Sequence, residues 1–226
     1  MRTPRRHGFT LMEVMVAVAI TALMGTLTLN AFTTAIKARE MVEAEAERHR
    51  MVRASMARMV REVGAAFVSD RYDSRRFRDQ AERPTNFVGE KEKLSFTSLA
   101  HQRLYADAKE SDQVVLEYAV ETSPDTAARG RKDMVRRANP NLFGEERMDR
   151  GGTKDILVEG VKRVEFAYWD SDKKEWDDEW DTRRLERKSI LPTRVKITLV
   201  LPDEAGKAIP YTTQTRIILN TEMPRF

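Results

Sequence analysis

Cysteine is absent from this chain of 226 residues, and histidine occurs only three times, at positions 7, 49 and 101. A chain without cysteine has no disulfide framework and no thiolate zinc site, so its stability depends on a packed core. The sequence also lacks a nucleophile elbow, a phosphate-binding glycine loop and an H-E-x-x-H pattern. These absences argue against an enzyme, and we predict no cofactor and no metal site.

One long stretch of the chain, from Val14 to Ile36, contains no charged residue. As a helix, these 23 residues reach roughly 34 Å, which is enough to cross a hydrocarbon core of about 30 Å. Arginines at positions 2, 5 and 6 precede the stretch, and basic residues stay on the cytoplasmic side. We therefore expect one membrane span, with residues 37 onward outside the inner membrane of a bacterium.

One acid, Glu13, lies at the start of this apolar stretch, where an inert signal anchor has no use for it. No clear small-residue cleavage site follows the stretch, as one would in an ordinary secretory signal. Cutting the Gly8–Phe9 bond would leave a new amino group one helical turn from Glu13. Between neighbouring chains displaced along an assembly axis, this amine and the acid would pair and offset each other's desolvation. The pattern predicts a processed subunit whose helices pack together.

The residues from Gly8 to Val14, Gly-Phe-Thr-Leu-Met-Glu-Val, resemble the class III signal of type IV pilins and type II secretion pseudopilins. This resemblance implies that a prepilin peptidase cuts after Gly8 and methylates the new N-terminal Phe9, and that Glu13 is the assembly glutamate. We expect four segments: a removed leader (1–8), a transmembrane and assembly helix (9–36), an amphipathic helix (37–68) and a periplasmic β-rich domain (69–226).

The helix is expected to continue past the membrane, because residues 37–63 contain no glycine or proline and many good helix formers. Arg39 with Glu43, and Glu47 with Arg50, are spaced to pair across turns. Six apolar residues and His49 recur at helical spacing and form one stripe: Val42, His49, Val52, Met56, Met59, Val63 and Ala66. We predict one helix from near Phe9 to near Phe67, with this stripe packed on the domain's own sheet.

After Ser69 the apolar residues alternate, which indicates strands with one buried face. The predicted strands are Leu94–Ser98, Val114–Val120, Met134–Arg137, Val161–Trp169, Val195–Leu201 and Tyr211–Asn220. The last two are expected to form a hairpin through the turn at 202–206, with Pro210 before the returning strand. Residues 129–152 are interpreted as a long charged excursion. The predicted fold class is α+β and type IV pilin-like, with a long N-terminal helix on an antiparallel sheet.

Basic residues do not form a nucleic-acid surface in this sequence. Without the leader, 37 basic residues face 36 acidic ones. The one arginine cluster is interleaved with Asp70, Asp73, Asp79 and Glu82, and consists of Arg71, Arg75, Arg76, Arg78 and Arg83. We predict no nucleic-acid partner.

An acidic stretch at 170–181 is the one place where the sequence suggests a cation. Counted from Asp170, the fifth, sixth and twelfth positions of a calcium loop are Lys174, Glu175 and Asp181, which do not fit the EF-hand pattern. We therefore predict a charged hairpin turn. Two tryptophans in this stretch, Trp176 and Trp180, are interpreted first as packing residues and second as a candidate partner surface.

Two further regions are similar to the minor pseudopilin J family of type II secretion. They are the helix segments 38–48 and 56–62, and the run from Val164 to Trp180 with its strand, acidic turn and paired tryptophans. The resemblance implies a structural subunit at the tip of the periplasmic pseudopilus, anchored in the inner membrane, that helps to drive export of folded proteins through the outer membrane. Its implied partners are the I, K and H pseudopilins, the major pseudopilin and the prepilin peptidase.

Two alternatives stay open at this point. A minor pilin of a type IV pilus would carry the same processing signal and serve a different machine. A signal-anchored periplasmic binding domain would use the helix only as a stalk, and would be a monomer that does not need Glu13.

Overall fold

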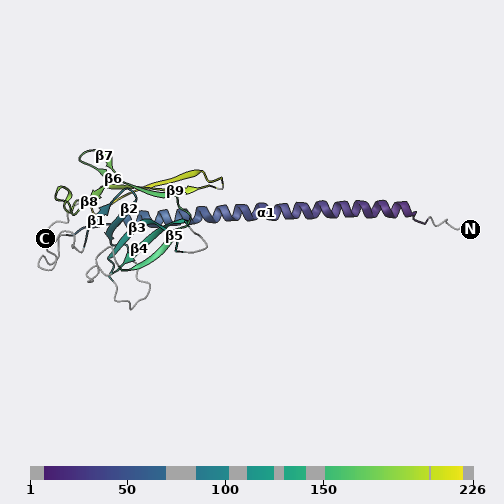
Figure 1. Cartoon of the computed structure of the whole chain (residues 1–226), viewed down its shortest axis with the longest axis horizontal. Coiled ribbons are helices and arrows are strands. Elements are labelled where there is room, and N and C mark those ends of the chain that lie inside the picture. The colour runs from purple at the N-terminus through teal and green to yellow at the C-terminus, as the bar shows by residue number, and fades with distance from the viewer. Residues whose placement is uncertain are drawn as a thin grey trace, which may run out of the picture. The chain divides into compact units, whose positions relative to one another are not determined.

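The computed structural model describes residues 8–69, 85–101, 111–124, 130–140, 151–203 and 205–220. The chain divides into two units, residues 1–50 and 51–226. Helix α1 (Leu11–Gly64) begins in the first unit and ends in the second (Figure 1). The predicted helix from near Phe9 to near Phe67 is therefore confirmed to within three residues at each end. By length and composition, α1 contains a segment able to cross a membrane.

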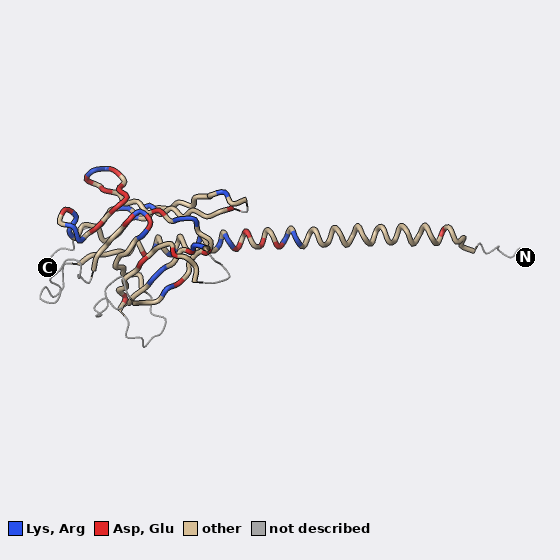
Figure 2. The backbone as a smooth tube through the Cα atoms, viewed as in Figure 1, with Lys and Arg blue, Asp and Glu red and all other residues tan. Residues whose placement is uncertain are grey.

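The first unit, in its described part, consists of helix with exposed apolar side chains. No charge appears along it between Glu13 and Lys37 (Figure 2). Its polar hydroxyls are satisfied within the helix, because the five threonines between Thr21 and Thr34 each donate to a carbonyl three or four residues earlier, at 2.7–3.0 Å. A helix that satisfies its own polar groups loses little when water is replaced by lipid.

The second unit contains two antiparallel sheets where we predicted one. The first has the strand order β5-β4-β3-β2-β1-β8 and the second the order β10-β9-β6-β7. A 3₁₀ turn, η3 (Leu185–Arg187), follows β8. The strands are β1 (Phe87–Gly89), β2 (Lys93–Ser98), β3 (Val114–Thr122), β4 (Lys132–Asn139), β5 (Thr153–Val158), β6 (Arg163–Asp170), β7 (Glu175–Asp177), β8 (Trp180–Asp181), β9 (Arg194–Pro202) and β10 (Ala208–Arg216). The predicted α+β class with antiparallel pairing is confirmed.

The core of the second unit lies between the end of α1 and the inner faces of the strands. Val52, Met59 and Val63 on the helix are buried in one cluster with residues of both sheets. The predicted stripe is therefore correct from Val52 onward. It is wrong for Val42, which is 69% exposed, and for His49, which is also exposed. Both lie in the first unit, whose described part is α1 preceded by residues 8–10 and offers no layer to cover them.

Hydrogen bonds join the last turns of α1 to both sheets. Ser55 Oγ donates to the carbonyl of Leu157 in β5 at 2.9 Å, and Thr215 Oγ1 of β10 donates to the carbonyl of Val60 at 3.2 Å. A Cβ placed on Gly64 would lie 3.2 Å from Thr215 Oγ1. Glycine at the end of the helix therefore lets β10 approach closely, and the helix is held from two sides.

The two sheets meet through Tyr168 of β6, whose ring reaches β1 of the other sheet. Tyr168 is fully buried, makes an edge contact with Phe87 at 5.8 Å between ring centroids, and donates its hydroxyl to the carbonyl of Glu90 at 2.9 Å. A Cβ on Gly89 would lie 2.2 Å from the ring. The absence of a side chain at Gly89 is what lets the ring pass, and burial raises the pKa of Tyr168 well above its usual value.

Several strand predictions need correction. The predicted strand Met134–Arg137 is confirmed as part of β4, which pairs with β3 along its whole length. The excursion predicted at 129–152 is therefore wrong for the residues of β4, while residues 129 and 141–150 lie outside the described part. The last strand is β10 (Ala208–Arg216), and so it begins before Pro210. Proline fits there because, among the described strands, β10 lies at the edge of its sheet and pairs with β9 alone. The predicted hairpin of β9 and β10 is confirmed, whereas β1, β5, β7 and β8 were not predicted.

A buried ionic cluster links α1 to the first sheet. Glu62, 2% exposed, accepts hydrogen bonds from the hydroxyl of Tyr118 and, at 3.0 Å, from Nε of Arg136, which is 6% exposed. Its other oxygen accepts from Nε of Arg58 at 3.1 Å, and Arg136 also contacts Asp155 at 3.3 Å. Burial, together with the charge of Glu62, raises the pKa of Tyr118 well above 10.0. Each buried charge is thus met by partners from another element.

Removing one member of this cluster should destabilise the second unit. We expect Glu62→Gln to lower the free energy of unfolding by roughly 3 kcal/mol, because it leaves the Arg136 charge buried with less compensation. Adding Arg136→Met should cost less than the sum of the two single changes. Unfolding of the full chain in detergent can be followed by the fluorescence of its three tryptophans, all of which lie in this unit.

The control is Glu47→Gln on the same helix, where Glu47 makes an exposed pair with Arg50. It should change the free energy by no more than about 0.5 kcal/mol. Strict additivity of the two buried changes would contradict the coupling.

Candidate functional site

The N-terminal end of α1 is closed by two residues that cap each other. Thr10 stands immediately before the first helical residue, and its hydroxyl accepts a hydrogen bond from the backbone N–H of Glu13 at 3.3 Å. In return, one carboxylate oxygen of Glu13, Oε2, accepts from the backbone N–H of Thr10 at 2.9 Å and from its hydroxyl at 3.0 Å. This is a capping box, in which a threonine and a glutamate three residues later satisfy the open N–H groups of the helix start.

The second carboxylate oxygen of Glu13 is left over by this arrangement. Within the described residues Oε1 makes no hydrogen bond, and the hydrogen bonds of the carboxylate all come from Thr10. The capping box therefore fixes the carboxylate in place and leaves one oxygen open to a donor from outside the chain. This oxygen can accept a hydrogen bond from a cation such as a protonated amine.

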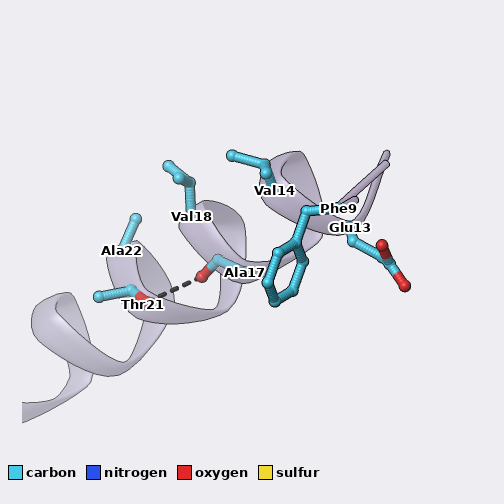
Figure 3. A pocket seen from close by; sticks show the side chains of 7 residues that line it. All are labelled: Phe9, Glu13, Val14, Ala17, Val18, Thr21 and Ala22. Atoms are coloured by element: carbon cyan, nitrogen blue, oxygen red, sulfur yellow. Dashed lines mark hydrogen bonds between the residues drawn. The ribbon is translucent and has the colours of Figure 1, made fainter. Parts of the chain in front are cut away.

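An apolar hollow runs along the helix beside Glu13. Figure 3 shows the carboxylate of Glu13 directed away from the apolar side chains that line this hollow. The floor of the hollow is formed by small side chains, those of Ala17, Thr21 and Ala22. The hydroxyl of Thr21 donates to the Ala17 carbonyl at 2.8 Å. Small residues at this spacing are where membrane helices approach each other closely. The residues that line the hollow are Phe9, Glu13, Val14, Ala17, Val18, Thr21 and Ala22.

Gly8 and Phe9 have no role in folding that the structure reveals. A Cβ on Gly8 would meet nothing within 4 Å, and Phe9 is 88% exposed. A glycine followed by an exposed phenylalanine is therefore not explained by packing or by backbone conformation at this position.

The two predicted tryptophans of the second unit have different environments. Trp180 is 4% exposed, donates from Nε1 to the carbonyl of Ile190 at 2.8 Å, and lies under the guanidinium of Arg187 at 4.0 Å. Trp176 is half-buried and packs edge-on against Trp169 with 5.3 Å between ring centroids. Trp180 thus belongs to the core, and the candidate partner surface is retained for Trp176 alone.

The acidic stretch that follows β6 forms the predicted hairpin with β7. Arg187 lies between Asp170 and Asp177 and makes ion pairs with both, the first at 3.3 Å. Asp181 is paired with Arg183 at 2.8 Å, and these hydrogen bonds outweigh the desolvation and lower the pKa of the Asp181 carboxyl. In the described part of the chain, no group of three or more acidic or histidine side chains is arranged to hold a metal ion. Arg183 and Arg187 thus pair with the carboxylates of Asp170, Asp177 and Asp181 in this region.

Sequence reasoning placed Glu13 at the site but missed its partner Thr10. The signal was available, because a threonine three residues before a glutamate at the start of an apolar helix is the pattern of a capping box. It also missed Trp169, which only the register of β6 with β7 places beside Trp176.

Comparison with known protein families identifies the family to which this chain belongs. The model of protein J of the type II secretion system matches residues 30–207, and that of the prokaryotic N-terminal methylation motif matches residues 3–29. The chain belongs to the type II secretion system protein J family. This J-family protein is a minor pseudopilin, and so the prediction made from its helix and its tryptophan segment is confirmed. It is anchored in the inner membrane by its apolar helix segment and carries its β-rich unit in the periplasm.

Among solved structures, a chain of the GspK–GspI–GspJ complex from the type 2 secretion system of enterotoxigenic Escherichia coli is similar to this pseudopilin. The sequence identity is 12%, the match covers 75% of this chain and 97% of the other, and the TM-score is 0.46. No curated protein matches the chain in sequence.

Loss of the Thr10 hydroxyl should loosen the start of α1. We expect Thr10→Val to speed amide hydrogen exchange of Glu13 about five-fold, because an N-cap contributes about 1 kcal/mol and this amide donates to the missing hydroxyl. The measurement is exchange of the full chain in a lipid nanodisc, read at single residues. Thr34→Val, which removes a hydroxyl bonded only to a carbonyl, is the matched control. Unchanged protection of Glu13 would show that the capping box does not persist in lipid.

Proposed function

We propose that this minor pseudopilin is cut between Gly8 and Phe9 and methylated on the new Phe9 amine. It then enters the tip of the pseudopilus, where its Glu13 receives the amine of a neighbouring subunit. The observation that carries the proposal is the carboxylate of Glu13, which is fixed by Thr10 and has one oxygen unoccupied within the described residues. Gly8 and Phe9 fit the role of a processing site, because nothing in the fold requires them.

The electrostatic argument starts from the cost of the lone carboxylate in lipid. An acid in a membrane segment costs about 2.5–3.5 kcal/mol near the bilayer centre and less near its end. The capping box reduces this cost but leaves a net negative charge. A protonated amine in the same layer removes it, and the attraction between the two is strong where water is excluded.

The neighbouring chain is the better source of that amine. Within its own chain Glu13 is hydrogen-bonded to Thr10, and no hydrogen bond joins its carboxylate to Phe9 among the described residues. Shifting one helix along its neighbour brings the amine of the second chain to the unoccupied oxygen of the first. The apolar hollow beside Glu13 gives the second helix a surface with small side chains to pack on.

The proposed partners follow from the family. We assign to this chain the I, K and H minor pseudopilins and the major pseudopilin as neighbours in the filament, and the prepilin peptidase as processing enzyme. The β-rich unit then carries the contacts outside the membrane. The family model supports type II secretion over a type IV pilus.

The N-terminus of the mature protein tests the processing step. Intact-mass and N-terminal peptide analysis of protein extracted from its native membrane should give a chain that begins at N-methylated Phe9. Gly8→Leu should leave the leader in place, whereas Gly25→Leu, at a glycine that also meets nothing within 4 Å, should be processed normally. A native chain that still starts at Met1, or one cut beyond residue 36, would contradict the proposal.

The assembly role of Glu13 is tested by Glu13→Leu. We expect the variant to be processed and its β-rich unit to fold, but to be lost from the filament and to abolish secretion, because a neighbour's amine then has no counter-charge. Incorporation is measured by co-purification with the other pseudopilins. The exposed glutamate of the same helix, Glu40→Leu, serves as control. A signal-anchored binding domain would be indifferent to the change, so normal secretion by the Glu13→Leu variant would favour that alternative.

A further inference from the structure

The outer face of the second sheet carries two tryptophans and three cations in one continuous arrangement. The strand registers place Arg216 of β10, Arg194 of β9, Trp169 of β6 and Trp176 of β7 directly opposite one another in a single row. Lys196, two residues along β9, lies with its ammonium 4.6 Å from the centre of the Trp176 ring. We call these five residues the Trp–Arg face.

This face points away from the core. Along β6 and β9 the buried residues alternate with half-buried or exposed ones, and Trp169, Arg194 and Lys196 belong to the second set. Residues directly opposite each other in a sheet project from the same side, so Arg216 and Trp176 share this side. Both tryptophan rings are only half-buried, because they shield each other but no layer of the described chain covers them.

The charges of the face are not balanced by ion pairs within the described part of the chain. Arg194 and Arg216 stand directly opposite each other, an arrangement of like charges that destabilises a sheet. Neither makes an ion pair with any described residue. The carboxylate nearest in register on this side is Glu165, and it is already paired with Arg163 at 2.7 Å. Figure 2 shows Lys and Arg positions along this sheet, in the region that Figure 1 labels β9.

We propose that the Trp–Arg face is a docking surface for an acidic surface of another protein of the secretion machine. Two arginines that make no ion pair among the described residues favour carboxylate partners, and Arg binds carboxylates through two parallel hydrogen bonds. Tryptophan and arginine are the residues that contribute most to binding at the centre of interfaces. The paired rings, which meet edge-on, give the partner an apolar area beside the cations. The inference rests on the proposed function, because it takes the partner from the assembled machine.

The full-length protein in its native membranes, together with the other secretion components, provides the test. A photo-crosslinking residue, p-benzoylphenylalanine, replaces Gln214, an exposed residue opposite Lys196 on the same face. We expect a cross-link to another protein, in a peptide that contains Asp or Glu, with a yield that falls as salt is raised. Arg194→Glu/Arg216→Glu should lower the yield about ten-fold, because like charges then meet across the interface.

The matched control makes the same charge reversal elsewhere. Lys132→Glu/Lys188→Glu changes two exposed lysines outside this sheet and should leave the yield unchanged. Trp176→Ala should lower the yield without changing its dependence on salt. Replacing the carboxylates of the linked peptide by lysine should restore cross-linking to the Arg194→Glu/Arg216→Glu protein. Resistance to limited proteolysis shows which variants are folded.

Other outcomes would overturn the proposal. A cross-link to lipid would identify the face as a membrane contact, one to nucleic acid as a basic binding surface, and one to a second copy of this chain as a self-interface. Equal yields from both charge-reversed proteins, or no product, would also reject it. The N-terminal mass and the effect of Glu13→Leu test the proposed function separately from the docking surface. If the mature chain begins at Phe9 and the filament depends on Glu13, but no acidic peptide is cross-linked, only the docking surface is rejected.

Discussion

The buried carboxylate of Glu62 is the interaction on which the second unit depends most. It joins one helix to two strands, because it bonds to Tyr118 of β3, Arg136 of β4 and Arg58 of its own helix. Apolar contacts alone would let a helix rotate or slide on a sheet at little cost. A buried charge allows one position only, since any shift would leave it without its partners. The cluster therefore sets the register of α1 on the first sheet.

The second sheet is placed by weaker but complementary contacts. The hydroxyl of Thr215 reaches the carbonyl of Val60, and the close approach at Gly64 leaves little room for a side chain. Tyr168 then connects this sheet to β1 through Gly89. Charge thus fixes one side of the helix and shape fixes the other. Among the described residues, the outer face of the second sheet takes no part in these contacts.

Much of this could be derived from the sequence because it follows from local patterns. The uncharged run after Glu13, the helical spacing of Val52, Met59 and Val63, and the alternation in β3 and β9 each report on one element. What could not be derived depends on contacts between distant segments. The burial of Glu62 required knowing that Arg136, 74 residues later, faces it. Splitting of the strands into two sheets and the short strands β1 and β8 are likewise decided by pairing across the chain.

The same distinction explains the two tryptophans. In sequence Trp176 and Trp180 are four residues apart, and residue type alone does not separate core from surface. In the structure a turn lies between them, so Trp180 enters the first sheet in β8 while Trp176 stays on the second in β7. Trp180 finds a carbonyl for its N–H and becomes core. Trp176 instead meets Trp169 and Lys196, and a ring that is covered by one neighbour and a cation is still open on its other side. Pairing with strands of different sheets, rather than residue type, therefore separates the buried tryptophan from the half-buried one.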